Sequence, residues 1–305
     1  MNSQLTDTFV MISPDTFGFN PQTAGSNVFQ HESQESEIET RNKALAEFQH
    51  AVNVLKKNDL HILVLPSRTD AVTPDAVFPN NWFSLHAGGS LVVYPMLAPN
   101  RRAERQVDAL VQLLDQNAIK TKVIDFSEEE ANGHILEGTG SIVLDRVHHI
   151  AYAMESVRTT KEMFEIWRLK MGYKGIFFHA NGKEGMPIYH SNMMMSIGED
   201  FAVWCPESMK NVQESNMVEE SLLASGKELT TITLDQLYAF CGNILQVKNV
   251  KGEKLIIMSD QAYKAFDAVQ RMRLEKHGRI ISFPIPTIES VGGGSARCML
   301  AEVFR

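Results

Sequence analysis

With 305 residues, 44% of them hydrophobic and 22% charged, the chain has the composition of a globular protein that can bury a sizeable core. Its formal net charge is −8, and no run of Lys or Arg is longer than the pair Arg101-Arg102, so we expect no nucleic-acid partner. The N-terminus lacks the basic start of a signal peptide and no apolar run is long enough to span a bilayer, which predicts no membrane association and a cytoplasmic location.

A segment rich in Pro, Gly, Asn and Ser over residues 13–30 predicts a long loop, and loops of this length are often functional. After it, apolar residues at helical spacing predict a helix over 36–57, and a short apolar run predicts a strand over 61–65. This helix-then-strand unit recurs four times, at 101–116 and 120–125, 157–171 and 175–178, 207–225 and 229–234, and 260–277 and 279–283. Short strands are predicted in the intervals, over 89–94, 141–144 and 149–153.

The five predicted helices start roughly 50 to 65 residues apart, which is an internal period. No Gly/Ser linker and no run of charge separates one unit from the next. Five α/β modules packed on one core therefore fit better than two independent domains, and we expect residues 1–305 to form a single domain. An approximately five-fold ring of such modules would bring the loops at their ends to one central cavity.

The three cysteines, Cys205, Cys241 and Cys298, form no CxxC pair and are odd in number. This spacing favours reduced thiols over a disulfide framework or a zinc site, and we treat Cys205 and Cys241 as core residues. The adjacent pair His148-His149 has no metal-ligand spacing and is interpreted as turn residues that face solvent. We therefore predict no metal and no cofactor.

The sequence GGGSARC at 292–298 places Cys298 behind three consecutive glycines. A glycine backbone can take positive φ and come very close to a ligand, so this segment suits a thiol that acts as a nucleophile. The alternative is a buried structural cysteine that enters a last short strand over 299–304.

Three further segments combine loop residues with functional groups. The segment 73–86 contains two prolines that argue against a central strand, 136–145 places an acid before two glycines, and 188–198 places a histidine beside a tyrosine and three methionines. Each also has a plain structural interpretation, as a polar surface loop, a turn or a satisfied core histidine. The functional side chains of these segments are Asp75, Asn80, Asn81, His86, Glu137, His190 and Asn192.

The chain thus supplies one Cys, one His and one Glu on predicted loops. These are the groups needed for a thiol nucleophile, an acid/base that works near neutral pH, and a carboxylate that orients the imidazole. A thiol attacks as the thiolate, so Cys298 would need a neighbouring imidazolium or a cationic substrate. The residues favour a cysteine hydrolase, although sequence spacing does not show that Glu137, His190 and Cys298 meet in space.

These segments resemble the guanidino-group-modifying superfamily, which includes arginine deiminases, dimethylarginine dimethylaminohydrolases and amidinotransferases. The overall sequence pattern is most similar to that of the related citrulline-utilisation hydrolases. The resemblance runs from NPQTAGSNVFQ at 20–30 to the last ten residues. GGGSARCM at 292–299 is similar to the glycine-rich segment that precedes the nucleophilic cysteine in this family. LEG at 136–138 resembles the start of its acidic-Gly-Gly motif, and His190 falls where the family has its catalytic histidine.

The resemblance implies a fold and further roles. The family fold is a five-bladed α/β propeller of pseudo-repeats, the pentein fold, which agrees with the period of the sequence. TPDAVFPNN at 73–81 is similar to the loop that grips the guanidinium of the substrate, which implies this role for Asp75 and Asn81. Arg158 and Arg102 match arginines that hold the α-carboxylate of the substrate.

Two positions depart from the pattern of arginine deiminases, which have Asp where this chain has Asn81 and Asn192. An amide that faces a buried guanidinium loses a charge-assisted pair, and removing one partner of such a pair costs about 3–5 kcal/mol. A ureido group is neutral, and an Asn amide offers it both a donor and an acceptor. We therefore expect citrulline as substrate, with ornithine, ammonia and carbon dioxide as products.

In this prediction Cys298 attacks the ureido carbon, His190 protonates the departing nitrogen and then activates water, and Glu137 orients the imidazole and the substrate. The expected partner is a small amino acid, and the sequence leaves open whether the protein forms a homo-oligomer. Three alternatives remain: an arginine deiminase or methylarginine hydrolase, an amidinotransferase, and a non-catalytic relative that only binds an amino acid.

Overall fold

The structure is a computed structural model that describes residues 3–304. Its strands form five three-stranded sheets, and in each sheet the middle strand pairs antiparallel with one neighbour and parallel with the other. With the middle strand in second place, the sheets are β15 (Ala301–Val303), β1 (Thr8–Ile12) and β2 (His61–Leu65); β3 (Phe83–His86), β4 (Ser90–Val93) and β5 (Lys122–Asp125); β6 (Ile142–Asp145), β7 (Ile150–Met154) and β8 (Lys174–Phe178); β9 (Met195–Ile197), β10 (Phe201–Trp204) and β11 (Glu228–Thr231); and β12 (Leu245–Lys248), β13 (Lys254–Ser259) and β14 (Arg279–Phe283).

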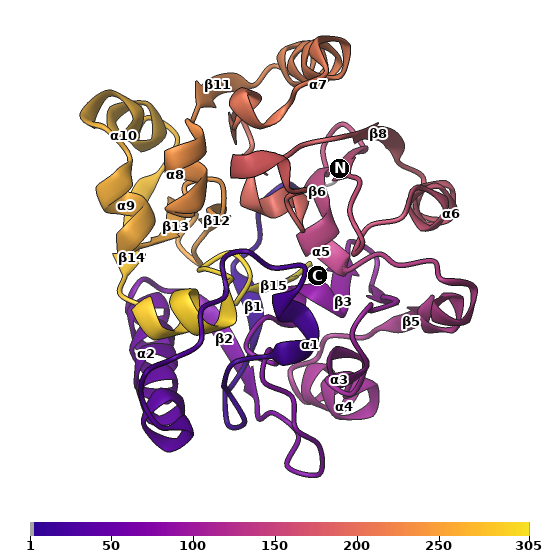
Figure 1. The fold of residues 1–305 in the computed structure, drawn as a ribbon, viewed down its shortest axis with the longest axis vertical. Helices are drawn as coiled ribbons and strands as arrows, with labels where there is room; N and C mark the ends of the chain where they lie inside the picture. Colours follow the sequence, from indigo (N-terminus) through magenta and orange to yellow (C-terminus); the bar gives the residue numbers. More distant parts are fainter. Residues whose placement is uncertain (1–2, 305) are drawn as a thin grey trace.

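Helices connect the two parallel strands of every sheet, because parallel strands need a crossover connection. In Figure 1 these helices lie toward the outside of the molecule and the strands lie inside them. The helices, in chain order, are α2 (Glu37–Lys57), α4 (Val107–Gln116), α6 (Lys161–Met171), α7 (Val212–Ala224), and the pair α9 (Asp260–Ala265) and α10 (Ala268–Glu275). Five short helices complete the α and π elements: α1 (Pro21–Ala24), α3 (Pro99–Arg102), α5 (Gly138–Ser141), α8 (Leu234–Tyr238) and a π-helix (Ile288–Gly292).

The first sheet is closed by the end of the chain. Strand β15 pairs antiparallel with β1, with Val10 opposite Ala301, while β2 pairs parallel with the other edge of β1. Cys298 stands three residues before β15, and in Figure 1 β15 lies near the centre of the molecule. The pairing of the two chain ends therefore brings the candidate nucleophile to the centre.

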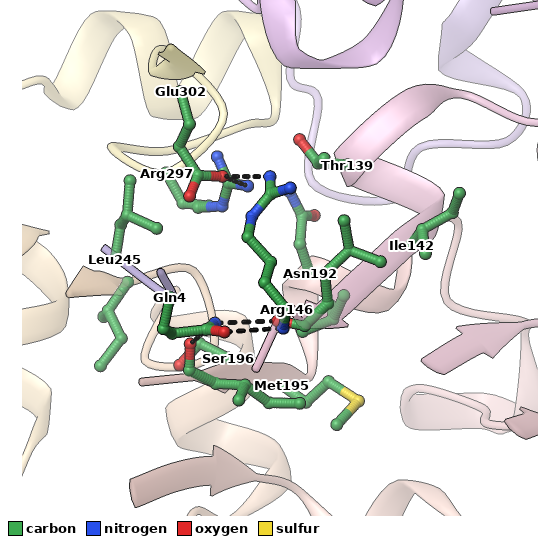
Figure 2. Close-up of a pocket in the computed structure, with 14 residues that line it drawn as sticks. Gln4, Thr139, Ile142, Arg146, Asn192, Met195, Ser196, Leu245, Arg297 and Glu302 are labelled. Atoms are coloured by element: carbon green, nitrogen blue, oxygen red, sulfur yellow. Dashed lines mark hydrogen bonds and ion pairs between the residues drawn. The ribbon is translucent and has the colours of Figure 1, made fainter. Parts of the chain in front are cut away.

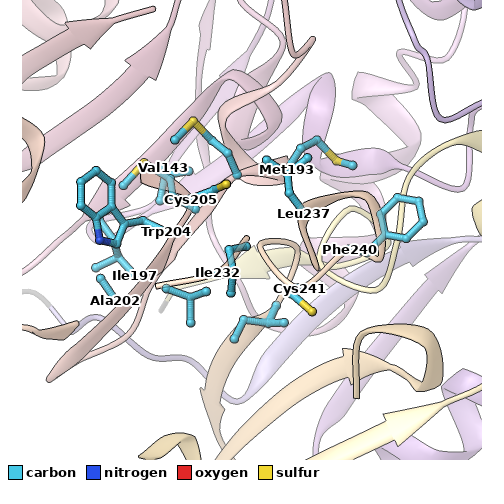
Figure 3. Close-up of a cluster of buried hydrophobic side chains, with 14 of the residues drawn as sticks. Val143, Met193, Ile197, Ala202, Trp204, Cys205, Ile232, Leu237, Phe240 and Cys241 are labelled. Atoms are coloured by element: carbon cyan, nitrogen blue, oxygen red, sulfur yellow. The ribbon is translucent and has the colours of Figure 1, made fainter. Parts of the chain in front are cut away.

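The predicted core cysteines lie inside the largest hydrophobic cluster, which Figure 3 shows in close-up. Cys205 and Cys241 have no exposed surface and pack with residues such as Trp204 and Phe240. Burial raises the pKa of Cys205 to about 11, and it also raises the pKa of Cys241. Their complete burial confirms that both are core residues.

The structure confirms the five helix-then-strand units and corrects several helix starts. The predicted helix 101–116 is two helices, α3 and α4, separated by residues 103–106. The helices predicted from 157 and 207 begin instead at Lys161 and Val212, because the preceding Thr160 and Asn211 cap them with side-chain hydrogen bonds. The helix predicted over 260–277 breaks before α10, where Asp267 forms a capping box.

The segments 73–86 and 188–198 are not loops throughout, because each ends in a strand, β3 and β9 respectively. The prolines argue against a central strand in 73–86, and β3 is indeed an edge strand of its sheet. Pro79 is the first residue of a 3-10 turn over Pro79–Asn81, so it lies before the paired part of the strand. No helix within residues 3–304 has both the length and the apolar content that a bilayer crossing requires.

Candidate active site

Cys298, His190 and Glu137 come together at the centre of the molecule. Cys298 and His190 line one small cavity, and His190 Nε2 lies 2.9 Å from Glu137 Oε2. Each of the three side chains is at most 2% exposed. They come from three different modules, since Glu137 precedes β6, His190 precedes β9 and Cys298 precedes β15.

Two glycines allow this close approach of the modules. Gly138 has φ +48°, and a Cβ atom on it would lie 2.3 Å from the carbonyl oxygen of Asn80. A Cβ atom on Gly140 would lie 2.4 Å from Asn81 Nδ2 and 2.6 Å from His190 Nδ1. Any larger residue at either position would force the loop of Glu137 away from the loops of Asn81 and His190.

The charges of Glu137 and His190 are set by their surroundings. Burial by itself would raise the pKa of Glu137, but Arg158, the hydrogen bond from His190 and Arg101 outweigh it and lower that pKa to about 2. Burial lowers the pKa of His190 to about 4, against the opposite effect of Glu137. At neutral pH a neutral imidazole therefore donates its Nε2–H to a carboxylate, which leaves Nδ1 free to accept a proton.

Two amide groups face the sulfur of Cys298. Asn243 Nδ2 lies 3.2 Å and Asn192 Nδ2 lies 3.4 Å from Cys298 Sγ. Asn243 is held in place by two further hydrogen bonds, from its Nδ2 to the carbonyl of Asn192 at 3.1 Å and to its Oδ1 from the backbone N–H of Arg297 at 3.1 Å. Two N–H donors therefore point at the one sulfur, from two different modules.

Asn243 was not among the predicted site residues, although a signal for it exists. It stands two residues before β12, as Asn81 stands two residues before β3. The preceding Gly242 packs so closely that a Cβ atom would lie 2.3 Å from the carbonyl oxygen of Met193. A Gly-Asn pair just ahead of the first strand of a module is thus the pattern that would have identified this residue.

Three predicted substrate-binding residues present buried polar atoms without a partner among the described residues. Asp75 Oδ2 accepts hydrogen bonds from Asn20 at 2.6 Å and Thr23 at 3.2 Å, but Asp75 Oδ1 accepts none. Asn81 Nδ2 and Asn192 Oδ1 are also unpaired. Buried polar atoms are almost always hydrogen-bonded, so these three atoms are candidates to bind a ligand. Asp75 and Asn81 both line the cavity, whereas Asn192 lines a different pocket, together with Arg146 and Arg297.

The predicted arginines lie in different places. Arg158 lines the cavity, where its guanidinium donates to Ser26 Oγ at 2.8 Å and to the carbonyl of Thr23 at 3.0 Å, and covers the ring of Tyr189 at 4.8 Å. Tyr189 in turn donates to the carbonyl of Gly293, which fixes the glycine-rich segment.

Arg102 does not line the cavity. Its guanidinium donates to the carbonyls of Met96 and Leu97 and lies 3.2 Å from Glu130. Its neighbour Arg101 does line the cavity, because successive residues of a helix point about 100° apart.

Arg101 is completely enclosed by acceptors. It forms two hydrogen bonds of 2.9 Å with Glu104, and its Nη1 donates to Asn81 Oδ1 at 2.7 Å. This bond fixes the orientation of the Asn81 amide, with its oxygen toward Arg101 and its nitrogen unpaired. Within residues 3–304, no group of three or more His, Cys, Asp or Glu side chains is arranged to hold a metal ion.

Comparison with known proteins places this site in a family. Residues 13–305 match the model of the family described as N,N dimethylarginine dimethylhydrolase, eukaryotic. No curated protein sequence matches the chain.

Several solved structures are similar in fold. A mutant of the N-terminal domain of ArgZ bound to substrate, described as an arginine dihydrolase from the ornithine–ammonia cycle in cyanobacteria, has a TM-score of 0.74 at 15% identity over 98% of both chains. A mutant of AgrE in complex with L-arginine has a TM-score of 0.73 at 16% identity, over 98% of this chain and 40% of AgrE. A dimethylarginine dimethylaminohydrolase adduct with 4-chloro-2-hydroxymethylpyridine has a TM-score of 0.64 at 15% identity, over 97% of this chain and 99% of that one. The chain therefore belongs to the N,N-dimethylarginine dimethylhydrolase family, within the guanidino-group-modifying superfamily of hydrolases and related enzymes.

Proposed function

We propose that the protein hydrolyses the ureido group of citrulline to give ornithine, ammonia and carbon dioxide. The orientation of Asn81 carries this proposal, because its oxygen accepts from Arg101 and only its N–H₂ group is left for a substrate. A ureido oxygen accepts such a hydrogen bond, whereas a guanidinium presents only N–H donors. An amide donor facing a guanidinium would be unpaired, so the site favours the neutral substrate.

The unpaired oxygen of Asp75 complements the rest of a ureido group. Asp75 lines the cavity, and its Oδ1 is an acceptor that would take the ureido N–H groups. Arg158 lies in the cavity and is the predicted partner of the α-carboxylate. For Arg102 to share that role, its side chain would have to leave the carbonyls of Met96 and Leu97.

The proposed mechanism gives Cys298, His190 and Glu137 the roles expected from the sequence. His190 Nδ1 takes the proton of Cys298, and the thiolate attacks the ureido carbon to form a C–S bond. The imidazolium, stabilised by Glu137, then gives its proton to the departing nitrogen, and a thiocarbamate remains on the sulfur. His190 next removes a proton from water, which attacks the thiocarbamate, and the sulfur leaves with the proton. The released carbamate breaks down to carbon dioxide and the second amine.

We also infer that the five modules form the closed five-bladed α/β propeller expected from the family, with this site at its centre and the chain acting as one catalytic domain. The common topology of the five sheets and the completion of the first sheet by β15 support this arrangement. The peripheral position of the connecting helices in Figure 1 is consistent with it.

Arginine is the second candidate substrate. ArgZ is described as an arginine dihydrolase and AgrE was crystallised with L-arginine. The unpaired acceptor in the cavity, Asp75 Oδ1, would also accept guanidinium N–H groups. Asn81 is the feature that separates the two candidates, since its free N–H₂ group suits only the ureido oxygen.

A substrate panel tests the proposal. Purified protein is incubated with citrulline, arginine and methylated arginines, and ammonia, methylamines, citrulline and ornithine are measured for each. We expect kcat/KM for citrulline to exceed that for arginine by about tenfold or more, since one unpaired buried donor costs about 1–3 kcal/mol. Cys298→Ser is the inactive control. Faster turnover of arginine or a methylarginine than of citrulline would overturn the proposal.

A further inference from the structure

A second cleft lies at the opposite ends of the strands that carry the active site. Asn81 precedes β3 and Glu137 precedes β6, whereas His86 ends β3 and Arg146 follows β6. His86 and Arg146 line a cleft of about 240 Å³ that opens to solvent. Because the active-site residues and the cleft residues lie at opposite ends of the same strands, a ligand in this cleft is not a substrate in the active site.

The charged side chains that line the cleft are all basic. They are Arg146 and Lys170, joined by His86 and His149, while Ser90 and Tyr173 add hydroxyl groups. No described residue that lines the cleft is an Asp or Glu. A cleft of this kind stands out in a protein whose formal net charge is −8.

Arg146 is a fixed and buried part of this cleft. Its side chain is 5% exposed, its guanidinium lies 4.2 Å from the centre of the Phe304 ring, and its Nη1 lies 3.4 Å from His86 Nδ1. Its conformation is therefore set by packing before any ligand binds, so binding does not incur the entropic cost of ordering this side chain.

The charge of Arg146 is only partly compensated. Its Nη2 lies 3.5 Å from Glu302 Oε2, but the same oxygen accepts a shorter bond of 2.8 Å from Arg297 Nη2. Figure 2 shows both guanidinium groups converging on this one carboxylate. Two cations thus share one anion, and a buried excess charge is costly unless another anion approaches it.

Lys170 supplies a second cation at the rim of the cleft. It lies at the C-terminal end of α6, is exposed, and forms no ion pair with a described residue. A planar guanidinium that can bind two oxygens, a mobile ammonium and a hydroxyl from Ser90 together suit a doubly charged oxyanion.

We propose that this cleft binds a small divalent oxyanion, of the phosphate or dicarboxylate class, between Arg146 and Lys170. The proposal is independent of the reaction at Cys298, because it is tested by binding rather than by turnover.

Two matched variants test the site. Lys170→Glu reverses the charge at the rim, and Lys161→Glu makes the same change at an exposed residue on the other end of α6, outside the cleft. Each protein is titrated with sodium phosphate and, separately, with sodium succinate in a calorimeter, at constant ionic strength maintained with sodium chloride. Trp167, whose ring centre lies 5.3 Å from that of Tyr173, offers a second readout by fluorescence. Thermal melts confirm that both variants are folded.

We expect saturable binding of at least one of the two anions to the unchanged protein and to Lys161→Glu, and about tenfold or more weaker binding to Lys170→Glu. The anion that binds more tightly shows whether the ligand belongs to the phosphate class or to the dicarboxylate class. The proposal is overturned if neither anion binds saturably to the unchanged protein. It is also overturned if Lys170→Glu binds as tightly as Lys161→Glu, because the anion would then bind elsewhere, for example at the active-site arginines.

Discussion

Asn243 Nδ2 lies 3.2 Å from Cys298 Sγ, although the two residues are 55 positions apart in the chain and precede the first strands of different sheets. Asn192, from a third sheet, places a second N–H donor 3.4 Å from the same sulfur. The nucleophile is thus held by donors from neighbouring modules, and its reactivity depends on how these modules pack.

Replacing Asn243 tests this arrangement. In Asn243→Ala the sulfur loses one donor, so we expect kcat to fall about tenfold to a hundredfold while KM changes little, since a hydrogen bond to a charged group contributes about 1.5–3 kcal/mol. Alkylation of Cys298 by iodoacetamide at pH 7 should slow in parallel. Asn243→Asp keeps the shape but places an acceptor at the sulfur, and should slow alkylation further. Wild-type alkylation rates in both variants would show that Asn243 has only a structural role.

The acid limb of the pH–rate profile should follow the protonation of His190, whose imidazole is hydrogen-bonded to Glu137. Because burial lowers the pKa of His190 to about 4, the imidazole is neutral and able to accept a proton above that pH. We expect kcat/KM to fall as pH decreases through about 4. In Glu137→Gln the imidazolium loses its anionic partner, so the limb should move to lower pH while the maximal rate drops. A limb that stays in place, or moves upward, in this variant contradicts the assigned pairing.

The specificity proposed for Asn81 is tested by changing its chemistry without changing its size. Asn81→Asp replaces the free N–H₂ group with an oxygen, while the other oxygen can still accept from Arg101. We expect kcat/KM for citrulline to fall by about tenfold or more and the arginine-to-citrulline ratio to rise, because the new acceptor suits guanidinium N–H groups. Asn81→Ala should lower the rate with citrulline without raising the rate with arginine. An unchanged ratio in Asn81→Asp would remove Asn81 as the determinant of specificity.

The sequence predicted the parts of this site that depend on residue type. A thiol, an imidazole and a carboxylate on predicted loops suit one reaction, which points to Cys298, His190 and Glu137, and the period of the helices predicts that their loops converge. The structure places these three side chains together. The helix starts were less predictable, since side-chain caps such as Thr160 and Asp267 override the apolar periodicity.

The parts that sequence reasoning missed depend on geometry between modules. Asn243 is a polar residue near a strand, and only the close packing of Gly242 on Met193 brings it to Cys298. Arg101 and Arg102 are adjacent and chemically identical, so only the position of α3 decides which of them enters the cavity.

Behind the glycine-rich segment, Glu289 is a buried acid whose charge should affect stability. It is 3% exposed, lies in the π-helix Ile288–Gly292, and accepts a hydrogen bond of 2.6 Å from Ser295 Oγ. Burial raises the pKa of Glu289 from 4.5 to about 7, with Ser259 and Ser295 opposing the shift and the nearby acids Glu47 and Asp260 adding to it. The folded protein therefore binds this proton more tightly than the unfolded chain does.

The sign of the effect follows from linkage. Below pH 4.5 the carboxyl is protonated in both states and costs nothing, whereas above pH 7 it is ionised in both and the folded state bears the cost of burying the charge. The contribution of Glu289 to the free energy of unfolding is thus lost as pH rises through about 7, by about 3 kcal/mol in total.

Glu289→Gln retains an acceptor for Ser295 and has no charge, so its melting temperature should exceed that of the unchanged protein at pH 8 but not at pH 4.5. Glu220→Gln, at an exposed position of α7, should behave as the unchanged protein at both pH values. If Glu289→Gln and the unchanged protein lose the same stability between these pH values, then Glu289 does not hold its proton in the folded state and the glycine-rich segment lies against a carboxylate.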